Sequence, residues 1–217
     1  MNEDDHQRPR APKSDTTSLT ANCDYDNYAD KAALRRALVT EQRGICCYCM
    51  GRIRNGPGTM KIEHWRCKSR YPAEQLNYRN LLAACPGGEG QPQHLQHCDT
   101  RKGDQDMKWN PADPNHHIET RLRYELDGTI RSDDPDFDQQ LNETLNLNLP
   151  FLKNNRKAVL DAVLKWWQSE KRRRNGSVPR YRFERERNRR TAGNGDLEPF
   201  CQVAVWWLEQ RLARSDP

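Results

Sequence analysis

The spacing of the cysteines constrains this chain more than any other feature of its sequence. Cys46 and Cys49 are separated by two residues, the spacing at which two thiolates can point towards one metal ion. A tetrahedral site needs a second pair, and Cys85 and Cys98 are the candidates, thirteen positions apart. The glycine-rich residues 86–90 have the composition of a loop, so these two cysteines can still meet. The sequence therefore predicts a structural Zn²⁺ site formed by the four cysteines.

The fourth zinc ligand has alternatives in the sequence. His94 and His97 lie close to Cys98, and either imidazole could replace that thiolate. A set of buried free cysteines is the alternative to a metal site as a whole. The chain has eight cysteines, and without a secretory signal such a number favours metal chemistry over a disulfide framework.

The composition argues against a membrane protein. Hydrophobic residues make up 34% of the chain and charged residues 31%. The longest apolar run, Val203–Leu208, has six residues, whereas a spanning helix needs about 20. Residues 1–12 are charged and contain no apolar stretch, which is not the pattern of a secretory signal. We therefore expect a cytoplasmic protein that binds no membrane.

The chain divides into three parts of an expected α+β fold. Residues 1–28 form a polar N-terminal arm, residues 29–114 a zinc-stabilised core, and residues 115–217 a mainly helical C-terminal lobe. Residues 174–198 are expected to form a basic connector that contains glycine. Apolar residues recur at helical spacing in three segments, and short apolar runs predict strands. Helices are expected at 30–43, 154–173 and 199–213, strands at 60–65 and 80–85, a short helix or turn at 97–104, and a hairpin at 118–131.

Charge is unevenly distributed along the chain. Residues 171–190 contain ten basic and two acidic side chains, whereas residues 111–150 contain three basic and nine acidic ones. A basic stripe of this kind attracts the phosphate backbone of nucleic acids. The alternative is a solvated, flexible linker. The candidate nucleic-acid contacts of the basic stripe are Lys171, Arg172, Arg173, Arg174, Arg180 and Arg182.

An acid–histidine pair lies between the two halves of the cysteine pattern. This region resembles the HNH endonucleases, which have an acid–histidine pair, an asparagine, and then a cysteine followed by asparagine and a nearby Lys-Gly pair. The resemblance implies a ββα-metal finger with a four-cysteine zinc knuckle, embedded among helices. This chain has glutamate where the family usually has the first aspartate, and aspartate in place of the late asparagine; both keep an oxygen ligand. The matching residues are Glu63, His64, Asn80, Cys98, Asp99, Lys102 and Gly103.

The resemblance implies how the central residues act on a phosphodiester bond. His64 would be the general base, because an imidazole titrates near neutral pH. Glu63 and Asp99 would hold one Mg²⁺ or Mn²⁺ ion, because hard cations prefer oxygen ligands. That ion would stabilise charge on the phosphate and on the departing 3′ oxygen.

Three further residues are implied to support the reaction. Asn80 would hold the loop of His64 by hydrogen bonds. Lys102 or Arg101 would contact a phosphate. The alternative reading of Lys102 is an ordinary surface ion pair with Asp99.

A closer resemblance covers roughly residues 12–214. It is to the HNH proteins of retron and Septu anti-phage systems, the PtuB-like group. This resemblance implies a toxic effector of bacterial defence that is restrained by an ATPase of the ABC/SMC type, PtuA-like. In retron forms it also implies a reverse transcriptase with its RNA–DNA hybrid. The runs that carry the resemblance are Lys61–Trp65, Tyr78–Leu82, His97–Asp104, Asn110–Asp113, Leu145–Asn148 and Glu198–Cys201.

Two classes of function compete on these observations. The first is a metal-dependent endonuclease, and the second is a non-catalytic zinc module that binds nucleic acid or scaffolds the ATPase. Glu63, His64 and Asp99 are all present, which favours the endonuclease because a scaffold does not need them. DNA is the expected substrate, and an RNA such as tRNA is the alternative, because the metal chemistry is indifferent to the sugar.

Overall fold

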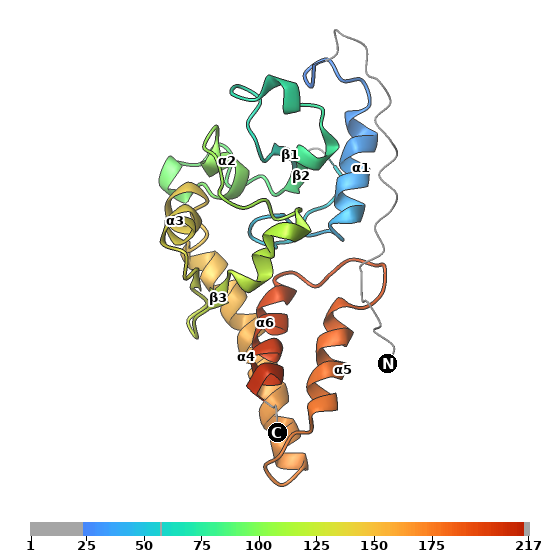
Figure 1. The fold of residues 1–217 in the computed structure, drawn as a ribbon, viewed down its shortest axis with the longest axis vertical. Helices are drawn as coiled ribbons and strands as arrows, with labels where there is room; N and C mark the ends of the chain where they lie inside the picture. The colour runs from blue at the N-terminus through green and yellow to red at the C-terminus, as the bar shows by residue number, and fades with distance from the viewer. Residues whose placement is uncertain (1–23, 57, 215–217) are drawn as a thin grey trace.

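The computed structural model describes residues 24–56 and 58–214 of the chain. Most of the arm predicted at 1–28 therefore lies outside the described residues. Figure 1 shows an elongated arrangement, with a pair of strands among short helices at one end and three longer helices at the other. The elements are α1 (Lys31–Glu41), β1 (Lys61–His64), β2 (Leu81–Ala84), α2 (Cys98–Lys102), β3 (Arg123–Tyr124), β4 (Ile130–Arg131), α3 (Pro135–Gln139), α4 (Pro150–Arg173), α5 (Arg180–Thr191) and α6 (Cys201–Arg214). A π-helical turn at Gln140–Thr144 continues α3, and 3-10 turns lie at Pro72–Glu74, Tyr78–Asn80, Gln93–Leu95, Pro114–His116 and Ile118–Thr120.

The first strand pair and the helix that follows it form the frame of the candidate site. β1 and β2 pair in antiparallel register, with Glu63 opposite Leu82 and His64 opposite Leu81. All four residues of β2 are buried, and α1 packs against it. The side-chain amide of Gln42, just after α1, exchanges two hydrogen bonds with the backbone of Ala83. The predicted strands and the short helix α2 are confirmed, each slightly shorter than expected.

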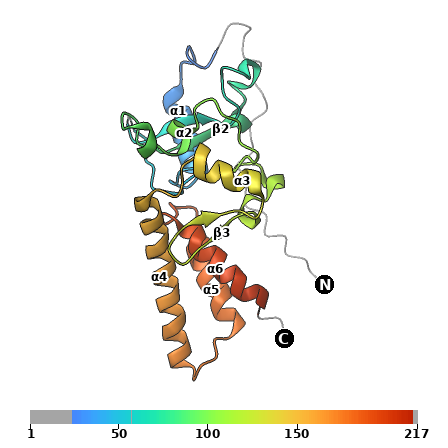
Figure 2. The ribbon, with the colours of Figure 1, turned by 90° about the vertical axis from the view of Figure 1, so that its left-hand side faces the viewer.

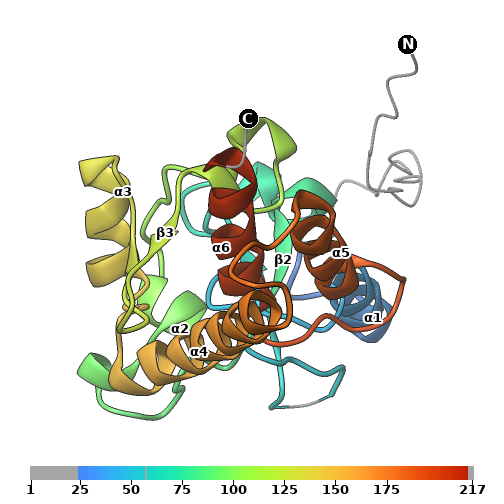
Figure 3. The ribbon, with the colours of Figure 1, turned by 90° about the horizontal axis from the view of Figure 1, so that it is seen from below.

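Three helices form the other end of the molecule. α6 packs against both α4 and α5, as Figure 2 and Figure 3 show from two further directions. Trp167 of α4 and Trp207 of α6 meet edge to face, with ring centroids 5.6 Å apart. The helices predicted at 154–173 and 199–213 are confirmed, although α4 begins earlier, at Pro150, a residue well suited to the first turn.

The basic segment expected as a connector at 174–198 contains a helix that the sequence analysis did not predict, because residues 180–191 form α5. The sequence does not predict this helix by apolar periodicity, because Phe183 is its one buried hydrophobic residue. The Phe183 ring packs edge to face on Trp166 of α4, with centroids 5.9 Å apart. Ion pairs between arginine and glutamate replace the apolar stripe by which an amphipathic helix is usually identified.

The predicted hairpin is present but much shorter than 118–131. Its strands β3 and β4 have two residues each, and residues 118–120 form a 3-10 turn instead of strand. At the turn, Gly128 has a φ of +85°, and a Cβ there would lie 2.0 Å from the carbonyl oxygen of Lys153 in α4. Fully buried Arg156 of α4 donates a hydrogen bond of 2.6 Å to the Gly128 carbonyl. The turn is therefore fixed to α4 by close packing.

Helices that could cross a lipid bilayer are absent from the described part of the chain, since none there is both long and apolar enough.

Candidate metal centre and active site

The four cysteines predicted to bind metal come together in the folded chain. The sulfur atoms of Cys46, Cys49, Cys85 and Cys98 all lie within 4.8 Å of one another, and all four side chains are buried. Cys46 lies 3.9 Å from Cys98 and Cys49 lies 3.8 Å from Cys85, sulfur to sulfur. Sulfur atoms at the corners of a tetrahedron around zinc are about 3.8 Å apart. The cluster could therefore bind a structural zinc ion.

The backbone around the cluster stabilises negative charge on sulfur. The amide of Gly51 donates to the Cys49 sulfur at 3.3 Å, and the amide of Cys85 donates to the Cys46 sulfur at 3.2 Å. Burial opposes ionisation of Cys46, but hydrogen bonds from the neighbouring thiols hold its pKa well below the usual value. A metal ion requires thiolate ligands, and these contacts favour that form at Cys46. Burial and the neighbouring thiols instead raise the pKa of Cys98 well above the usual value.

The two ends of the long loop before Cys98 lie close together, at Gly87 and His97. The amide of His97 donates to the carbonyl of Gly87 at 2.9 Å, and a Cβ on Gly87 would lie 2.2 Å from the His97 carbonyl oxygen. Cys98 is the fourth member of the cluster. His97 approaches from outside, with Nε2 3.7 Å from the Cys85 sulfur, and His94 is exposed. This arrangement favours Cys98 over either histidine as the fourth ligand.

A carboxylate pair lies where β1 meets α2. Glu63 is only 2% exposed, and its Oε1 accepts hydrogen bonds from the Tyr48 hydroxyl at 2.7 Å and from the Lys102 ammonium at 2.8 Å. Asp99 lies within hydrogen-bonding reach, and burial together with this second carboxylate raises the pKa of Glu63 well above the usual range. Two adjacent carboxylates suit one divalent cation. Among the described residues, no third His, Cys, Asp or Glu side chain gathers with these two as a ligand.

His64 is oriented by a backbone carbonyl. Its Nε2 lies 3.0 Å from the carbonyl oxygen of Gln75, and because a carbonyl only accepts, Nε2 carries the proton. Nδ1 is then left with its lone pair. Burial lowers the pKa of His64 below the usual value, so the ring is neutral near neutral pH. The side chain thus has the protonation state that a general base needs.

Asn80 lies beneath the segment that follows His64. It is buried, and its side-chain oxygen accepts from the amide of Arg66 at 2.7 Å. Its amide nitrogen donates to the carbonyls of Arg66 at 3.0 Å and of Glu74 at 3.1 Å. Asn80 therefore fixes both ends of the segment that supplies the Gln75 carbonyl to His64.

Lys102 and Arg101 occupy different positions from those expected of phosphate contacts. The Lys102 side chain has no exposed surface, and its ammonium binds Glu63 and the His64 carbonyl, the latter at 3.1 Å. Arg101 donates to the carbonyls of Gln93 and Glu143. In this conformation the Lys102 ammonium is bound to the Glu63 carboxylate and to the backbone of His64, so it is not available to a ligand. Arg101 holds two loops together.

We expect Lys102→Met to lower the free energy of unfolding by about 3 kcal/mol, because it leaves the buried Glu63 carboxylate without its cation. The measurement is urea unfolding of the full chain. Lys108→Met is the matched control, since Lys108 pairs with Asp134 at the surface, where solvent screens the pair and it contributes little to stability. Equal losses in the two variants would contradict the stabilising role of Lys102.

The basic stripe predicted to bind nucleic acid is largely engaged in ion pairs within the helical lobe. Arg182 forms a two-pronged pair with Glu170 at 2.8 Å, and Arg174 binds the same carboxylate at 3.3 Å. Arg180 pairs with Glu184 at 3.1 Å. The structure does not bring these residues near the acid–histidine pair. The remaining members of the stripe, Lys171, Arg172 and Arg173, lie in the last turn of α4.

The sequence did not predict three residues of the site, which are Tyr25, Tyr48 and Gln75. Tyr48 lies between the first two cluster cysteines, and that position could have suggested its contact with Glu63. Gln75 and Tyr25 carry no such signal. The Tyr25 ring meets His64 edge to face with centroids 4.5 Å apart, and Gln75 acts on His64 through its backbone.

The fold and the site define a class: a small α+β protein in which four buried cysteines that could bind a metal ion lie behind a strand that ends in an acid–histidine pair. No protein family model matches the chain. Over 94 residues the chain is 30% identical to the Septu protein PtuB of Bacillus thuringiensis. The match covers 41% of this chain and spans 33%, about a third, of the length of PtuB. The chain is thus similar to a Septu protein over that region.

Proposed function

We propose that this chain is a metal-dependent endonuclease of the HNH type, which hydrolyses phosphodiester bonds of nucleic acid. The observation that carries the proposal is the state of His64, a neutral imidazole that directly follows Glu63 at the end of β1 and whose Nε2 is held by the Gln75 carbonyl. Asp99 of α2 lies within reach of the same glutamate. A base beside a pair of oxygen ligands is the constellation that metal-assisted hydrolysis requires.

Each residue of the site has a distinct role in the proposed reaction. Nδ1 of His64 accepts the proton of the attacking water as its oxygen bonds to phosphorus and the 3′ oxygen departs. The Gln75 carbonyl, which accepts from Nε2, stabilises the imidazolium that forms. A divalent cation held by Glu63 and Asp99 would supply positive charge at the phosphate. Tyr48 and Lys102 fix one oxygen of Glu63, so that carboxylate does not reorganise during the reaction.

The similarity to a Septu protein supports a role in anti-phage defence. We propose that the nuclease is the toxic effector of such a system and that its partner is an ABC/SMC-type ATPase, PtuA-like, which restrains it. The comparison names a Septu protein and no retron component. We therefore propose no reverse transcriptase as a partner.

A non-catalytic zinc module is the second candidate function. It is favoured by Lys102, whose ammonium already neutralises the Glu63 carboxylate from within the protein. A carboxylate satisfied in this way can serve packing alone. In that case the four-cysteine cluster would stabilise a surface that binds nucleic acid or the ATPase.

Cleavage assays distinguish these two functions. Plasmid DNA, single-stranded DNA and total RNA are incubated with the full chain, with and without the co-encoded ATPase. Divalent ions are withheld and then Mg²⁺ or Mn²⁺ is added, because a chelator would also remove zinc from the cysteine cluster. We expect cleavage that depends on the added ion. Absence of cleavage with every substrate, with zinc bound and the ATPase present, would favour the non-catalytic module.

A further inference from the structure

The N-terminal end of the described chain packs directly onto the candidate active site. The half-buried ring of Tyr25 lies edge to face against His64, with centroids 4.5 Å apart. Its backbone amide donates to the side-chain oxygen of Gln75 at 3.1 Å, and the carbonyl of the same Gln75 accepts from His64. One residue therefore positions both the tyrosine and the histidine.

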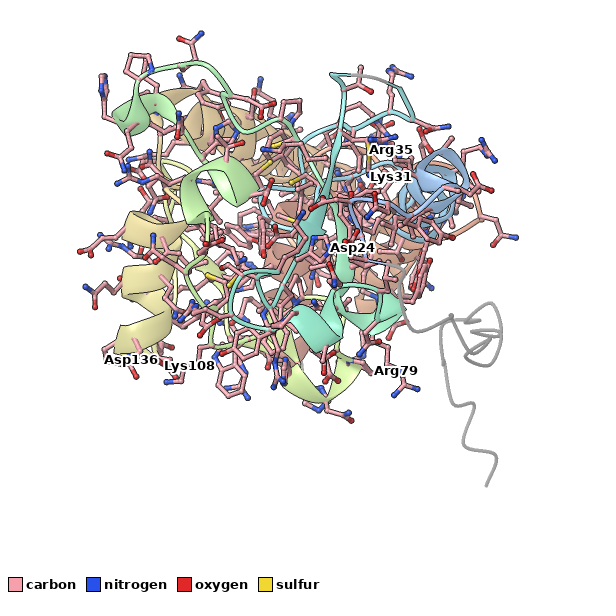
Figure 4. The ribbon with its side chains drawn as sticks, turned by 90° about the horizontal axis from the view of Figure 1, so that it is seen from above. Asp24, Lys31, Arg35, Arg79, Lys108 and Asp136 are labelled. Atoms are coloured by element: carbon pink, nitrogen blue, oxygen red, sulfur yellow. The ribbon has the colours of Figure 1, made fainter. Side chains whose placement is uncertain are left out.

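Cations surround this tyrosine. The ammonium groups of Lys31 and Lys68 lie 5.0 Å and 4.8 Å from the centre of its ring. Burial raises the pKa of the Tyr25 hydroxyl, and the nearby Arg35 opposes that rise. Figure 4 shows Lys31 and Arg35 next to each other on α1. Asp26 lies among these cations: it pairs with Lys68 at 2.6 Å and is itself exposed.

Arg66 is a further cation, two residues after His64 in the chain. It is exposed, and its guanidinium lies over the rings of Trp65 and Tyr71, 5.4 Å from each centroid. No carboxylate of the described residues lies within ion-pairing distance of it. A guanidinium stacked on aromatic rings keeps donors free for a phosphate, and the rings themselves can stack with nucleobases.

The surface near His64 differs from the basic stripe of α4 and α5 in how far its positive charges are paired with carboxylates of the protein. In the stripe, buried Glu170 and Glu186 accept ion pairs from five arginines, which are Arg173, Arg174, Arg182, Arg189 and Arg190. Those charges are largely neutralised within the protein and stabilise the helical lobe. The cations around Tyr25 and Trp65 instead adjoin the proposed base.

We propose that the side chains of Tyr25, Lys31, Arg35, Arg66 and Lys68, here called the Tyr25 surface, bind the phosphodiester backbone of nucleic acid next to His64. The inference rests on the proposed function and specifies where the substrate strand lies. The cations contact the phosphates that flank the scissile bond, and the Tyr25 hydroxyl donates to one of them. Exposed Asp26 is displaced from Lys68 when a phosphate takes its place.

Binding can be measured without cleavage in the His64→Ala background, in full-length protein and without Mg²⁺ or Mn²⁺. The probes are fluorescent single-stranded DNA, duplex DNA and RNA, followed by anisotropy at salt concentrations from about 50 to 300 mM. The test variant carries Lys31→Ala, Arg35→Ala, Arg66→Ala and Lys68→Ala. The matched control carries four alanine substitutions that remove the same charge from the basic stripe, at Lys171, Arg172, Arg173 and Arg185.

We expect the test variant to bind at least about 10-fold more weakly than its parent, with a salt slope reduced by roughly 3, because up to four phosphate contacts are lost. The control should bind like the parent. The probe that loses most affinity identifies the preferred substrate. Arg66→Ala alone, a change at an exposed side chain, should give a smaller loss in the same direction and covers the case that the fourfold variant does not fold.

Unchanged affinity in the test variant and in Arg66→Ala would overturn the proposal, as would loss of affinity confined to the control. Tyr25→Phe should weaken binding slightly and Tyr25→Ala more strongly. Failure of this proposal can be distinguished from failure of the proposed function, because binding is measured in a variant that does not cleave. A chain that cleaves nucleic acid but shows no effect of the Tyr25 surface would keep the nuclease and refute the binding surface.

Discussion

Replacing His64 with alanine is expected to lower the rate of cleavage at least about 100-fold, because a general base contributes this much or more to catalysis. The fold should survive, since His64 lies at the end of β1 and its main interactions are with Gln75 and Tyr25. Cleavage of the preferred substrate in Mg²⁺ measures the effect. Thermal unfolding and zinc content of the variant should match those of the unaltered protein.

His94→Ala is the matched control for this prediction. His94 is exposed and lies outside the four-cysteine cluster, so its loss should leave cleavage unchanged. Free imidazole added to His64→Ala should restore part of the rate, because it can enter the space left by the side chain. Full activity of His64→Ala would refute its assignment as the base, and equal loss in both variants would show that neither effect is specific.

The cysteine cluster and the strand pair were predictable because their signals are local. Two cysteines three positions apart bring both thiolates to one point, and a four-residue apolar run such as β2 has few alternatives to a buried strand. Cys85 and Cys98 could be paired because the glycine-rich loop permits the approach. Gly87, where a Cβ would meet the His97 carbonyl, shows how closely that loop returns on itself.

The roles of Lys102, Tyr25 and α5 could not be predicted because they depend on residues distant in the sequence. Lys102 is buried only because α2 lies beneath β1, where it meets Glu63. The position of Tyr25 depends on Gln75, fifty residues away. α5 lacks an apolar stripe and is stabilised through Phe183 and through pairs with Glu170 of another helix. A count of local charge therefore overstated what the basic stripe offers to nucleic acid.

Cys46→Ser and Cys85→Ser are each expected to abolish zinc binding and to unfold the strand end of the molecule. Structural zinc in a four-cysteine site contributes on the order of 10 kcal/mol to folding, which is comparable with the whole stability of a typical domain. Both sulfur atoms lie within the buried cluster. The Cys46 sulfur contacts that of Cys98, and the Cys85 sulfur contacts that of Cys49. Zinc content and thermal unfolding by circular dichroism measure the effect.

Cys47→Ser is the matched control, because it makes the same substitution one residue away from Cys46. Cys47 lies outside the cluster, and its backbone amide, which donates to the Ala83 carbonyl at 3.0 Å, is kept in the variant. One zinc ion per chain and an almost unchanged melting temperature are expected. If Cys46→Ser also kept its zinc and its melting temperature, the cluster would be a set of buried thiols. If His97→Ala lost zinc and Cys98→Ser kept it, the fourth ligand would be the histidine and Cys98 would be a neighbour.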